Sequence, residues 1–275
     1  MEKLIWSRSK NKILNDCFRK YYYQYISQNE ATEFQTLKKL KSRYFFKMIV
    51  LKNSIFNMIT DYLYGFDIAL ENYLDTAYKE LSIAIRTDSF LFEKYYNLNN
   101  KIDFLAFSVE LANNLKNFYN SEIFKIVKSK QLKDVIIPTL EEDIGQFDFL
   151  DYTIFFMPDL IVDNETSKLI INFFYDITRE NFDDYLAWTM ALSYLFVRAY
   201  NIAEFEKLVF INYSLRDNIF KQANYNERQI SKKIDELKKS IILMQKFQNE
   251  TDIEKFYKTN NNEICKFCNF QKLCF

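Results

Sequence analysis

The chain has 275 residues, of which 49% are hydrophobic and 18% aromatic, so it can bury a substantial core. Its two glycines and two prolines exclude glycine-rich phosphate loops, Rossmann fingerprints and turn-dense sandwiches. It holds no histidine, which excludes Ser-His-Asp and Cys-His nucleophiles and histidine-ligated zinc, and its formal net charge is zero.

The first 130 residues predict mostly helices. Ser7 or Ser9 can cap a helix in which apolar residues recur every three or four positions up to Tyr21. Further helical patterns cover residues 34–64, 66–86 and 104–128. Residues 1–60 hold 12 basic and 4 acidic residues, which indicates either a basic face for a polyanion or ordinary solvated helix faces.

The pattern changes to strands in the middle of the chain, which holds 13 acidic and 3 basic residues over 131–185. Three successive strands are predicted at 135–137, 152–156 and 169–175, with a turn at 163–165. A helix at about 180–200, a strand at 207–213 and a helix at 225–248 follow.

This order predicts an α/β (α+β) fold in a single domain, residues 1–275. Its parts are a helical portion (1–130), a sheet core (131–215) and a C-terminal helix with a cysteine cluster (216–275). Residues 1–8 hold no apolar run, and the longest uncharged apolar run, 185–197, is too short to span a bilayer. We therefore expect a cytoplasmic protein with no membrane partner.

The cysteines are the most specific signal. Cys265, Cys268 and Cys274 lie within the last eleven residues, and Cys17 is the only other cysteine. Three closely spaced thiolates can reach one metal centre, and a fourth ligand would have to be Cys17. The alternatives are an all-cysteine zinc site, an iron–sulfur cluster, or a Cys17 that merely packs as a small hydrophobic residue.

A family resemblance rests on several of these segments. The run from Trp6 to Tyr23, the Pro158-Asp159 pair, the strand 168–175 and the cysteine spacing resemble RecB-like nucleases of the PD-(D/E)XK superfamily. Two further segments, 114–119 and Glu141-Glu142, are similar more loosely. The subgroup that the chain resembles, which includes AddB-type and CRISPR-adaptation exonucleases, implies a restriction-endonuclease-like core. It also implies a 4Fe-4S cluster on Cys17, Cys265, Cys268 and Cys274.

The same resemblance shows an altered active site. The family's chemistry needs carboxylates that hold Mg²⁺ or Mn²⁺ and a lysine near the attacking water. Asn172 occupies the (D/E) position and Phe174 the lysine position. The residues implied as remnant ligands are Asp159, Glu141 and Glu142.

Two other expected residues are also replaced. Asn57 stands where an activating histidine is usual, and residues 181–202 lack the usual glutamine. Asp176 is a poor substitute for a carboxylate at position 172, because an extended strand puts it roughly 13 Å away. Lys168 is likewise a poor substitute for a lysine at position 174, roughly 20 Å away. We therefore expect a site that no longer cleaves.

Three functions follow as hypotheses. The first is an inactive nuclease-like protein that holds an iron–sulfur cluster and binds DNA, either single-stranded DNA or a DNA end. Its partner would be a helicase or another repair or defence subunit. Its candidate contacts are Arg8, Lys10, Lys12, Arg19 and Lys20, beside Tyr21, Tyr22 and Tyr23, which can stack bases or simply pack around the cluster. The second is an active Mg²⁺- or Mn²⁺-dependent exonuclease with rearranged carboxylates. The third is a protein–protein module whose metal is purely structural.

Overall fold

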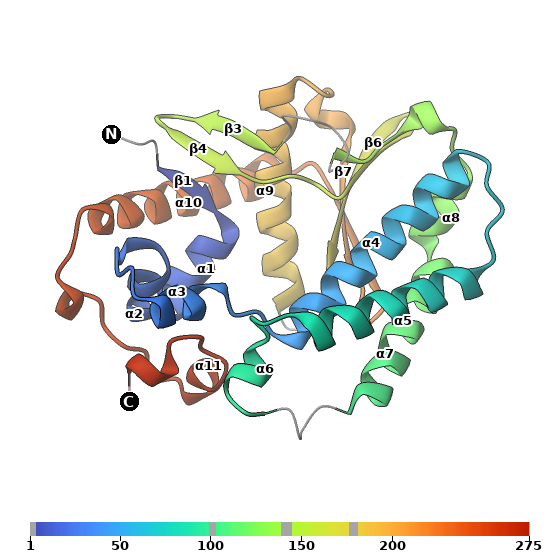
Figure 1. Cartoon of the computed structure of the whole chain (residues 1–275). Coiled ribbons are helices and arrows are strands. Elements are labelled where there is room, and N and C mark those ends of the chain that lie inside the picture. The colour runs from blue at the N-terminus through green and yellow to red at the C-terminus, as the bar shows by residue number, and fades with distance from the viewer. Residues whose placement is uncertain (1–3, 99–102, 139–144, 176–180, 275) are drawn as a thin grey trace.

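The computed structural model describes residues 4–98, 103–138, 145–175 and 181–274 (Figure 1). Helices dominate its first part and two small sheets follow, so the predicted α+β class is confirmed. The helices before the sheets are α1 (Arg8–Asp16), α2 (Phe18–Tyr21), a π-helical turn (Tyr22–Ile26), α3 (Thr32–Lys39), α4 (Arg43–Leu63), α5 (Leu70–Thr87), α6 (Phe92–Tyr95), α7 (Phe104–Tyr119) and α8 (Glu122–Lys128).

Side-chain caps fix where several of these helices begin. The Ser7 hydroxyl accepts a hydrogen bond from the Lys10 N–H, as the first of the two caps considered predicts. Ser42 caps α4 and Ser121 caps α8 in the same manner. Each cap satisfies a backbone N–H that the first turn leaves without an intrahelical partner.

The larger sheet has five strands in the order β2-β5-β6-β7-β8. Strands β6 and β7 are parallel, and the other neighbours are antiparallel. The bounds are β2 (Val135–Ile136), β5 (Leu160–Asn164), β6 (Ser167–Phe174), β7 (Leu208–Ser214) and β8 (Ile219–Asn224). In the parallel pair Asn172 stands opposite Asn212, so both side chains lie on one face.

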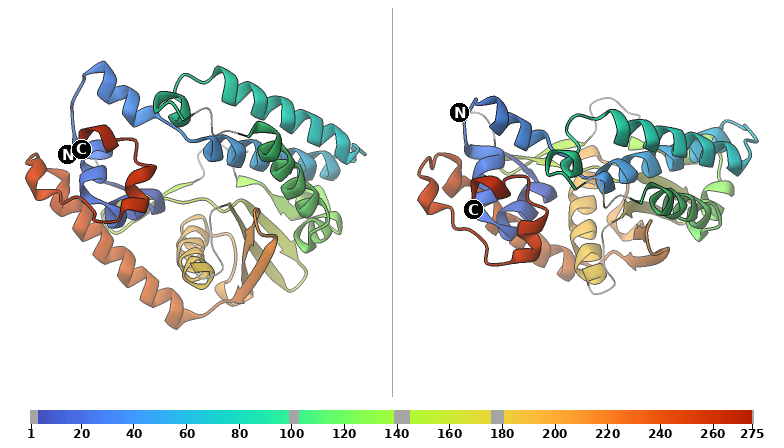
Figure 2. Two further views of the ribbon diagram at one scale, coloured as in Figure 1. Left: turned by 90° about the horizontal axis from the view of Figure 1, so that it is seen from below. Right: turned by 60° about the horizontal axis from the view of Figure 1, so that its bottom comes forward.

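Helices cover the two faces of this sheet. Leu169, Ile171 and Phe173 of β6 pack with apolar residues of α4, α5, α7 and α8. Ile170 points the other way, toward α9 (Phe182–Tyr200) and α10 (Glu227–Gln248). Figure 2 shows α9 lying between the sheet and α10. Because both faces are covered, the central strands β6 and β7 are mostly apolar and buried.

A second sheet of three strands, in the order β1-β4-β3, holds the start of the described chain. It contains β1 (Ile5–Ser7), β3 (Gln146–Phe149) and β4 (Tyr152–Phe155), and β1 runs parallel to β4. Trp6 of β1 is fully buried and donates from its indole nitrogen to the Ser240 hydroxyl of α10 at 2.8 Å. This contact fixes the entry to α1.

The strand prediction was incomplete. Between residues 135 and 174 the structure has five strands rather than three, because β3 and β5 were missed. Strands β1 and β8 were not predicted either. Strands β1, β3 and β8 lie at the edges of their sheets, so they carry little of the apolar alternation that marks a half-buried strand. Strand β5 is central, but its last two residues, Asp163 and Asn164, fall in the stretch expected to turn. The chain reversal expected at 163–165 lies at Glu165-Thr166.

The apolar run 185–197 lies within α9, and most of its side chains are buried. In the part of the chain that the structure describes, none of the helices combines the length and the apolar character that a membrane span needs.

Candidate metal centre and carboxylate site

Cys17 lies in the break between α1 and α2. Its backbone is extended, and its sulfur accepts a hydrogen bond from the Lys20 N–H at 3.5 Å, so the thiol caps α2 as a serine would. This geometry holds the sulfur at the N-terminus of α2.

The other three cysteines lie on a chain of tight turns at the C-terminal end. Cys265 belongs to α11 (Asn262–Lys266), and its carbonyl accepts from the Cys268 N–H at 3.1 Å. The Cys268 carbonyl accepts from Gln271, whose carbonyl accepts in turn from Cys274. These successive turns curl the segment so that its three sulfurs reach a common space.

All four cysteines line one cavity of about 270 Å³. The sequence separates Cys17 from the C-terminal three by most of the chain, and the fold brings them together. Lys20, Tyr23 and Lys258 also line the cavity. All four thiols are free in the described structure. That they bind a metal stays a prediction.

The N-terminal helices and the C-terminal segment are joined by buried polar contacts. The Arg19 side chain is buried and donates from Nε to the Phe256 carbonyl at 2.7 Å, and the Arg19 N–H donates to the Tyr257 carbonyl at 3.1 Å. The Tyr23 hydroxyl donates to the Leu273 carbonyl at 3.4 Å. Figure 2 shows the first helices and the last segment side by side.

A second set of contacts ties the cysteine segment to the helices that follow α2. The Tyr96 hydroxyl donates to the Asn269 carbonyl at 2.6 Å, and the Asn269 amide donates to the Leu40 carbonyl at 2.9 Å. Tyr23, Phe34 and Phe270 form an aromatic cluster beneath them, with ring centroids 5.3–5.9 Å apart. The segment between Cys268 and Cys274 is therefore held from two directions.

The thiols affect one another electrostatically. Burial raises the pKa of the Cys268 thiol, Lys20 opposes this shift, and the nearby Cys274 and Cys17 thiols add to it. Burial also raises the pKa of Cys274, while Lys258 lowers it and the Cys17 thiol raises it. Four thiolates gathered here would repel one another, and a bound cation would relieve that repulsion.

The two candidate metal groups differ in size. Four thiolates bound to one zinc ion through bonds of about 2.3 Å stand about 3.8 Å apart, and a cluster of several iron atoms spreads its ligands further. Among the described residues, no group of three or more Cys, Asp or Glu side chains is arranged as a metal site.

Asp159 is the carboxylate that the resemblance places at the active site, and both its oxygens are engaged. It is 9% exposed. Oδ2 accepts from the Phe173 N–H at 2.6 Å, and Oδ1 lies 2.8 Å from the Lys52 ammonium of α4. Lys52 was not among the predicted site residues, because nothing in the sequence connects two residues 107 positions apart.

The described residues beside Asp159 form no metal site. Asn172 is 3% exposed, and its amide nitrogen makes no hydrogen bond to any described atom. The Phe174 ring packs edge-on against Tyr185 at 5.6 Å, and the Arg8 guanidinium lies 3.7 Å from the Tyr185 ring. The position of the expected lysine is thus filled by aromatic packing.

The remaining predicted active-site residues are dispersed or undescribed. Glu141, Glu142 and Asp176 lie outside the described residues. Asn57 is on the exposed side of α4. Lys168 lies near the other end of β6 from Phe174 and forms an ion pair at 2.7 Å with Asp163 of the neighbouring strand, in line with its rejection as a substitute.

Most of the predicted nucleic-acid contacts are engaged within the protein. Lys10 donates to the Ile5 carbonyl, and Lys12 pairs with Asp16. Arg19 is buried, Arg8 lies over Tyr185, and Lys20 lines the cysteine cavity. Tyr21 and Tyr23 are also buried. Of the two roles considered for this segment, packing around the cysteine cavity is the one that these contacts favour.

No protein-family model matches the chain, and no curated protein matches it significantly.

Proposed function

We propose that the chain is a nuclease-like protein of the PD-(D/E)XK type, RecB-like iron–sulfur subgroup, whose carboxylate site no longer cleaves. It binds DNA, single-stranded or at an end, and holds an iron–sulfur cluster on its four cysteines. The observation that carries the proposal is the convergence of Cys17 with Cys265, Cys268 and Cys274 on one cavity of about 270 Å³. A helicase or another repair or defence subunit is the partner class that this ancestry suggests.

The pattern of the cysteines favours a cluster over zinc. One distant cysteine with a C-terminal group of three is less typical of a zinc ribbon, which uses two Cys-x-x-Cys pairs, and it resembles the cysteine arrangement of the iron–sulfur subgroup. When bound, such a cluster would supply four strong bonds to thiolate and a redox-active core. The chain's own residues would exclude water from it with the Tyr23 and Phe270 rings and place Lys20 and Lys258 beside its negative charge.

The loss of cleavage is supported by the surroundings of Asp159. A divalent cation needs free carboxylate oxygens. One oxygen of Asp159 is taken by a backbone N–H and the other by the Lys52 ammonium, which already supplies a positive charge at this place. Asn172 and Phe174 offer neither a negative charge nor a cation in compensation.

Metal analysis tests the cluster. Protein purified without oxygen is expected to be brown, to contain iron and acid-labile sulfide in equal amounts, and to lose both in Cys17→Ser. Ser9→Ala, an exposed change on the preceding helix α1, is the matched control and should keep them. One zinc per chain and no iron would overturn the cluster and leave an all-cysteine zinc protein.

Nuclease assays test the carboxylate site. Single-stranded DNA with Mg²⁺ or Mn²⁺ is expected to remain intact. Cleavage that disappears in Asp159→Ala would instead establish the active exonuclease, with Glu141, Glu142 and Asp176 as the remaining ligands to examine. A protein that holds its metal but binds no DNA at low salt would be the protein–protein module.

A further inference from the structure

A second cavity lies where α3 meets α4, and basic side chains line it. Its volume is about 450 Å³, and its lining residues are Lys38, Lys39, Leu40, Lys41, Asp88 and Phe90. None of these residues belongs to the cysteine cavity or to the surroundings of Asp159. Three lysines and one aspartate give the cavity an excess of two positive charges (3 − 1 = 2).

The cavity has a fixed backbone wall. Lys41 and Leu91 form an isolated parallel bridge. The Lys41 N–H donates to the Phe90 carbonyl, and the Phe92 N–H donates to the Lys41 carbonyl, each at 2.9 Å. Two segments that are distant in sequence are thereby pinned together, which positions the lysines before any ligand arrives.

The ammonium groups that line this cavity can still contact an anionic ligand. Lys39 and Lys41 are exposed, neither forms an ion pair with a described residue, and the Lys41 ammonium lies 4.9 Å from the Phe45 ring centroid. Among the described residues, the Lys38 ammonium donates to the Ser27 carbonyl at 2.9 Å, and a carbonyl does not cancel its charge. The Asp88 carboxylate also lines the cavity, and one of its oxygens accepts from the Phe90 N–H at 2.6 Å.

An aromatic face accompanies these charges. The half-buried Phe90 ring lines the cavity, and the Lys39 ammonium lies 5.5 Å from its centroid. Cations beside an accessible ring are the combination that binds single-stranded nucleic acid, since phosphates contact the cations and a base stacks on the ring. An acidic peptide would use the cations but would have no base to stack.

We propose that this cavity is a contact site for the sugar–phosphate backbone of single-stranded DNA, with Lys39 and Lys41 on the phosphates and Phe90 against a base. The inference rests on the proposed DNA-binding function and places that function away from α1 and α2. The cavity also touches the cysteine segment, because the Leu40 carbonyl in its wall accepts from Asn269.

The test compares two double variants. In the whole protein, Lys39→Gln with Lys41→Gln should weaken binding of a labelled oligothymidine strand about tenfold at low salt. It should also reduce the slope of log affinity against log salt by about 1.4, because each phosphate that a lysine neutralises on a single strand contributes about 0.7. Lys232→Gln with Lys239→Gln removes equal charge from the exposed side of α10 and should change binding less than twofold.

Phe90→Leu separates stacking from charge. It should weaken binding severalfold and leave the salt slope unchanged, because base stacking releases no counterions. Thermal unfolding of each variant checks that the fold is intact, and Lys39→Glu with Lys41→Glu provides a second variant in which binding should weaken further.

The outcomes distinguish this inference from the function on which it rests. If the wild-type protein and the Lys39→Gln, Lys41→Gln variant bind DNA with the same affinity and the same salt dependence, the cavity is not the contact site. The proposed DNA-binding function would still stand. Wild-type protein that binds no strand at all overturns both. Binding of polyglutamate, but not of the oligonucleotide, would assign the cavity to an acidic protein and also overturn the proposal.

Discussion

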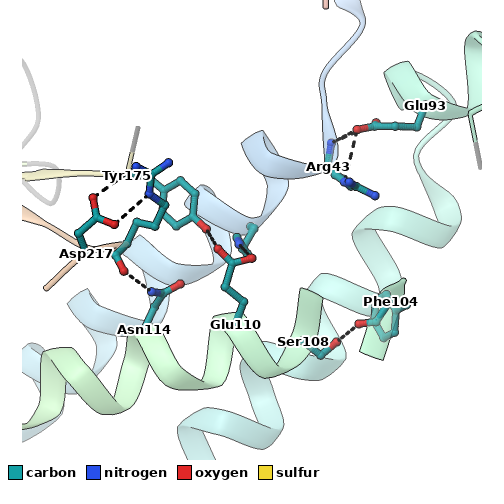
Figure 3. A network of polar contacts seen from close by, with 10 residues as sticks. Arg43, Glu93, Phe104, Ser108, Glu110, Asn114, Tyr175 and Asp217 are labelled. Carbon is teal, nitrogen blue, oxygen red and sulfur yellow. Dashed lines mark hydrogen bonds and ion pairs between the residues drawn. The ribbon is translucent and has the colours of Figure 1, made fainter. Parts of the chain in front are cut away.

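Glu110 and Tyr175, joined by a hydrogen bond in Figure 3, lie beside Lys47, a fully buried lysine whose surroundings show how this chain accommodates a charge in its core. The Lys47 ammonium lies 2.6 Å from the Glu110 carboxylate and faces the rings of Phe107 and Tyr175 at 4.4 and 4.7 Å. The Tyr175 hydroxyl donates to the other oxygen of Glu110 at 2.7 Å. Burial lowers the pKa of Lys47, and its ion pair with Glu110 only partly restores it.

Removing the negative charge of Glu110, the partner of Lys47, should lower the free energy of unfolding. Glu110→Gln leaves the Lys47 charge buried without a counterion, which costs about 3–5 kcal/mol in a fully buried pair. Because the Glu110 side chain is 40% exposed, we expect a smaller effect, about 2 kcal/mol in the free energy of unfolding by urea. Lys47→Met, which keeps the apolar contacts and leaves only a partly solvated carboxylate, should cost less. The reverse order would show that the buried ammonium does not depend on Glu110.

The pH dependence of the same pair has a definite sign. Burial opposes ionisation of Glu110, but hydrogen bonds from Lys47 and Tyr175 outweigh it and lower its pKa below the ordinary 4.5. The stabilisation from Glu110 is therefore complete above about pH 4.5 and is lost as the pH falls through the lowered pKa. The stability difference between wild type and Glu110→Gln should shrink below that pH. A constant difference from neutral to acid pH would exclude the ionised carboxylate as its cause.

At the scale of an element, strand β1 shows how three residues can fix a chain end. Trp6 is fully buried, donates to Ser240 of α10 and stacks on Trp188 of α9 at 6.0 Å. The strand leads directly into α1, which ends next to Cys17. The position of the first cysteine therefore depends on how β1 is docked.

Truncating this anchor should loosen the N-terminal end. Trp6→Ala is expected to cost about 3–5 kcal/mol in urea unfolding, as large-to-small changes at buried aromatic residues do. It should also lower the iron content of the purified protein, because α1 no longer holds Cys17 in place. Ile5→Ala, on the exposed side of the same strand, should change stability by less than about 0.5 kcal/mol. If Trp6→Ala keeps its full metal content, the docking of β1 does not determine the position of Cys17.

Elements differ in how well the sequence predicts them, and the reason is physical. Helices such as α9 and α10 were predicted because their apolar stripes repeat over many turns. The edge strand β8 carries mostly half-exposed side chains and was missed. The juxtaposition of the cysteines was expected because only four exist. The Lys52–Asp159 pair was not, because either residue alone has no distinctive spacing and only the tertiary fold joins them.

At the scale of the whole molecule, the junction of α1 and α2 and the C-terminal segment meet at the cysteine cavity, while the five-stranded sheet lies at the opposite side (Figures 1 and 2). The C-terminal segment after α10 reaches this place through a stretch with little regular structure. Its attachment depends on the contacts of Arg19, on the aromatic cluster around Phe270 and, in our proposal, on the metal group. Metal binding then contributes directly to the stability of the folded chain.

Removing the metal group should release that end selectively. After anaerobic chelation we expect a lower midpoint of urea unfolding and faster cleavage by a nonspecific protease between residues 249 and 261, where α10 has ended and α11 has not begun. Cys17→Ala should give the same cleavage pattern without chelation, because removing a single ligand opens the site from the other end. Sites within β6 and β7 should stay protected in both cases, since their ladder and the helices on both faces do not involve the cysteines. Identical digestion before and after chelation would mean that the side-chain contacts alone hold the two ends together.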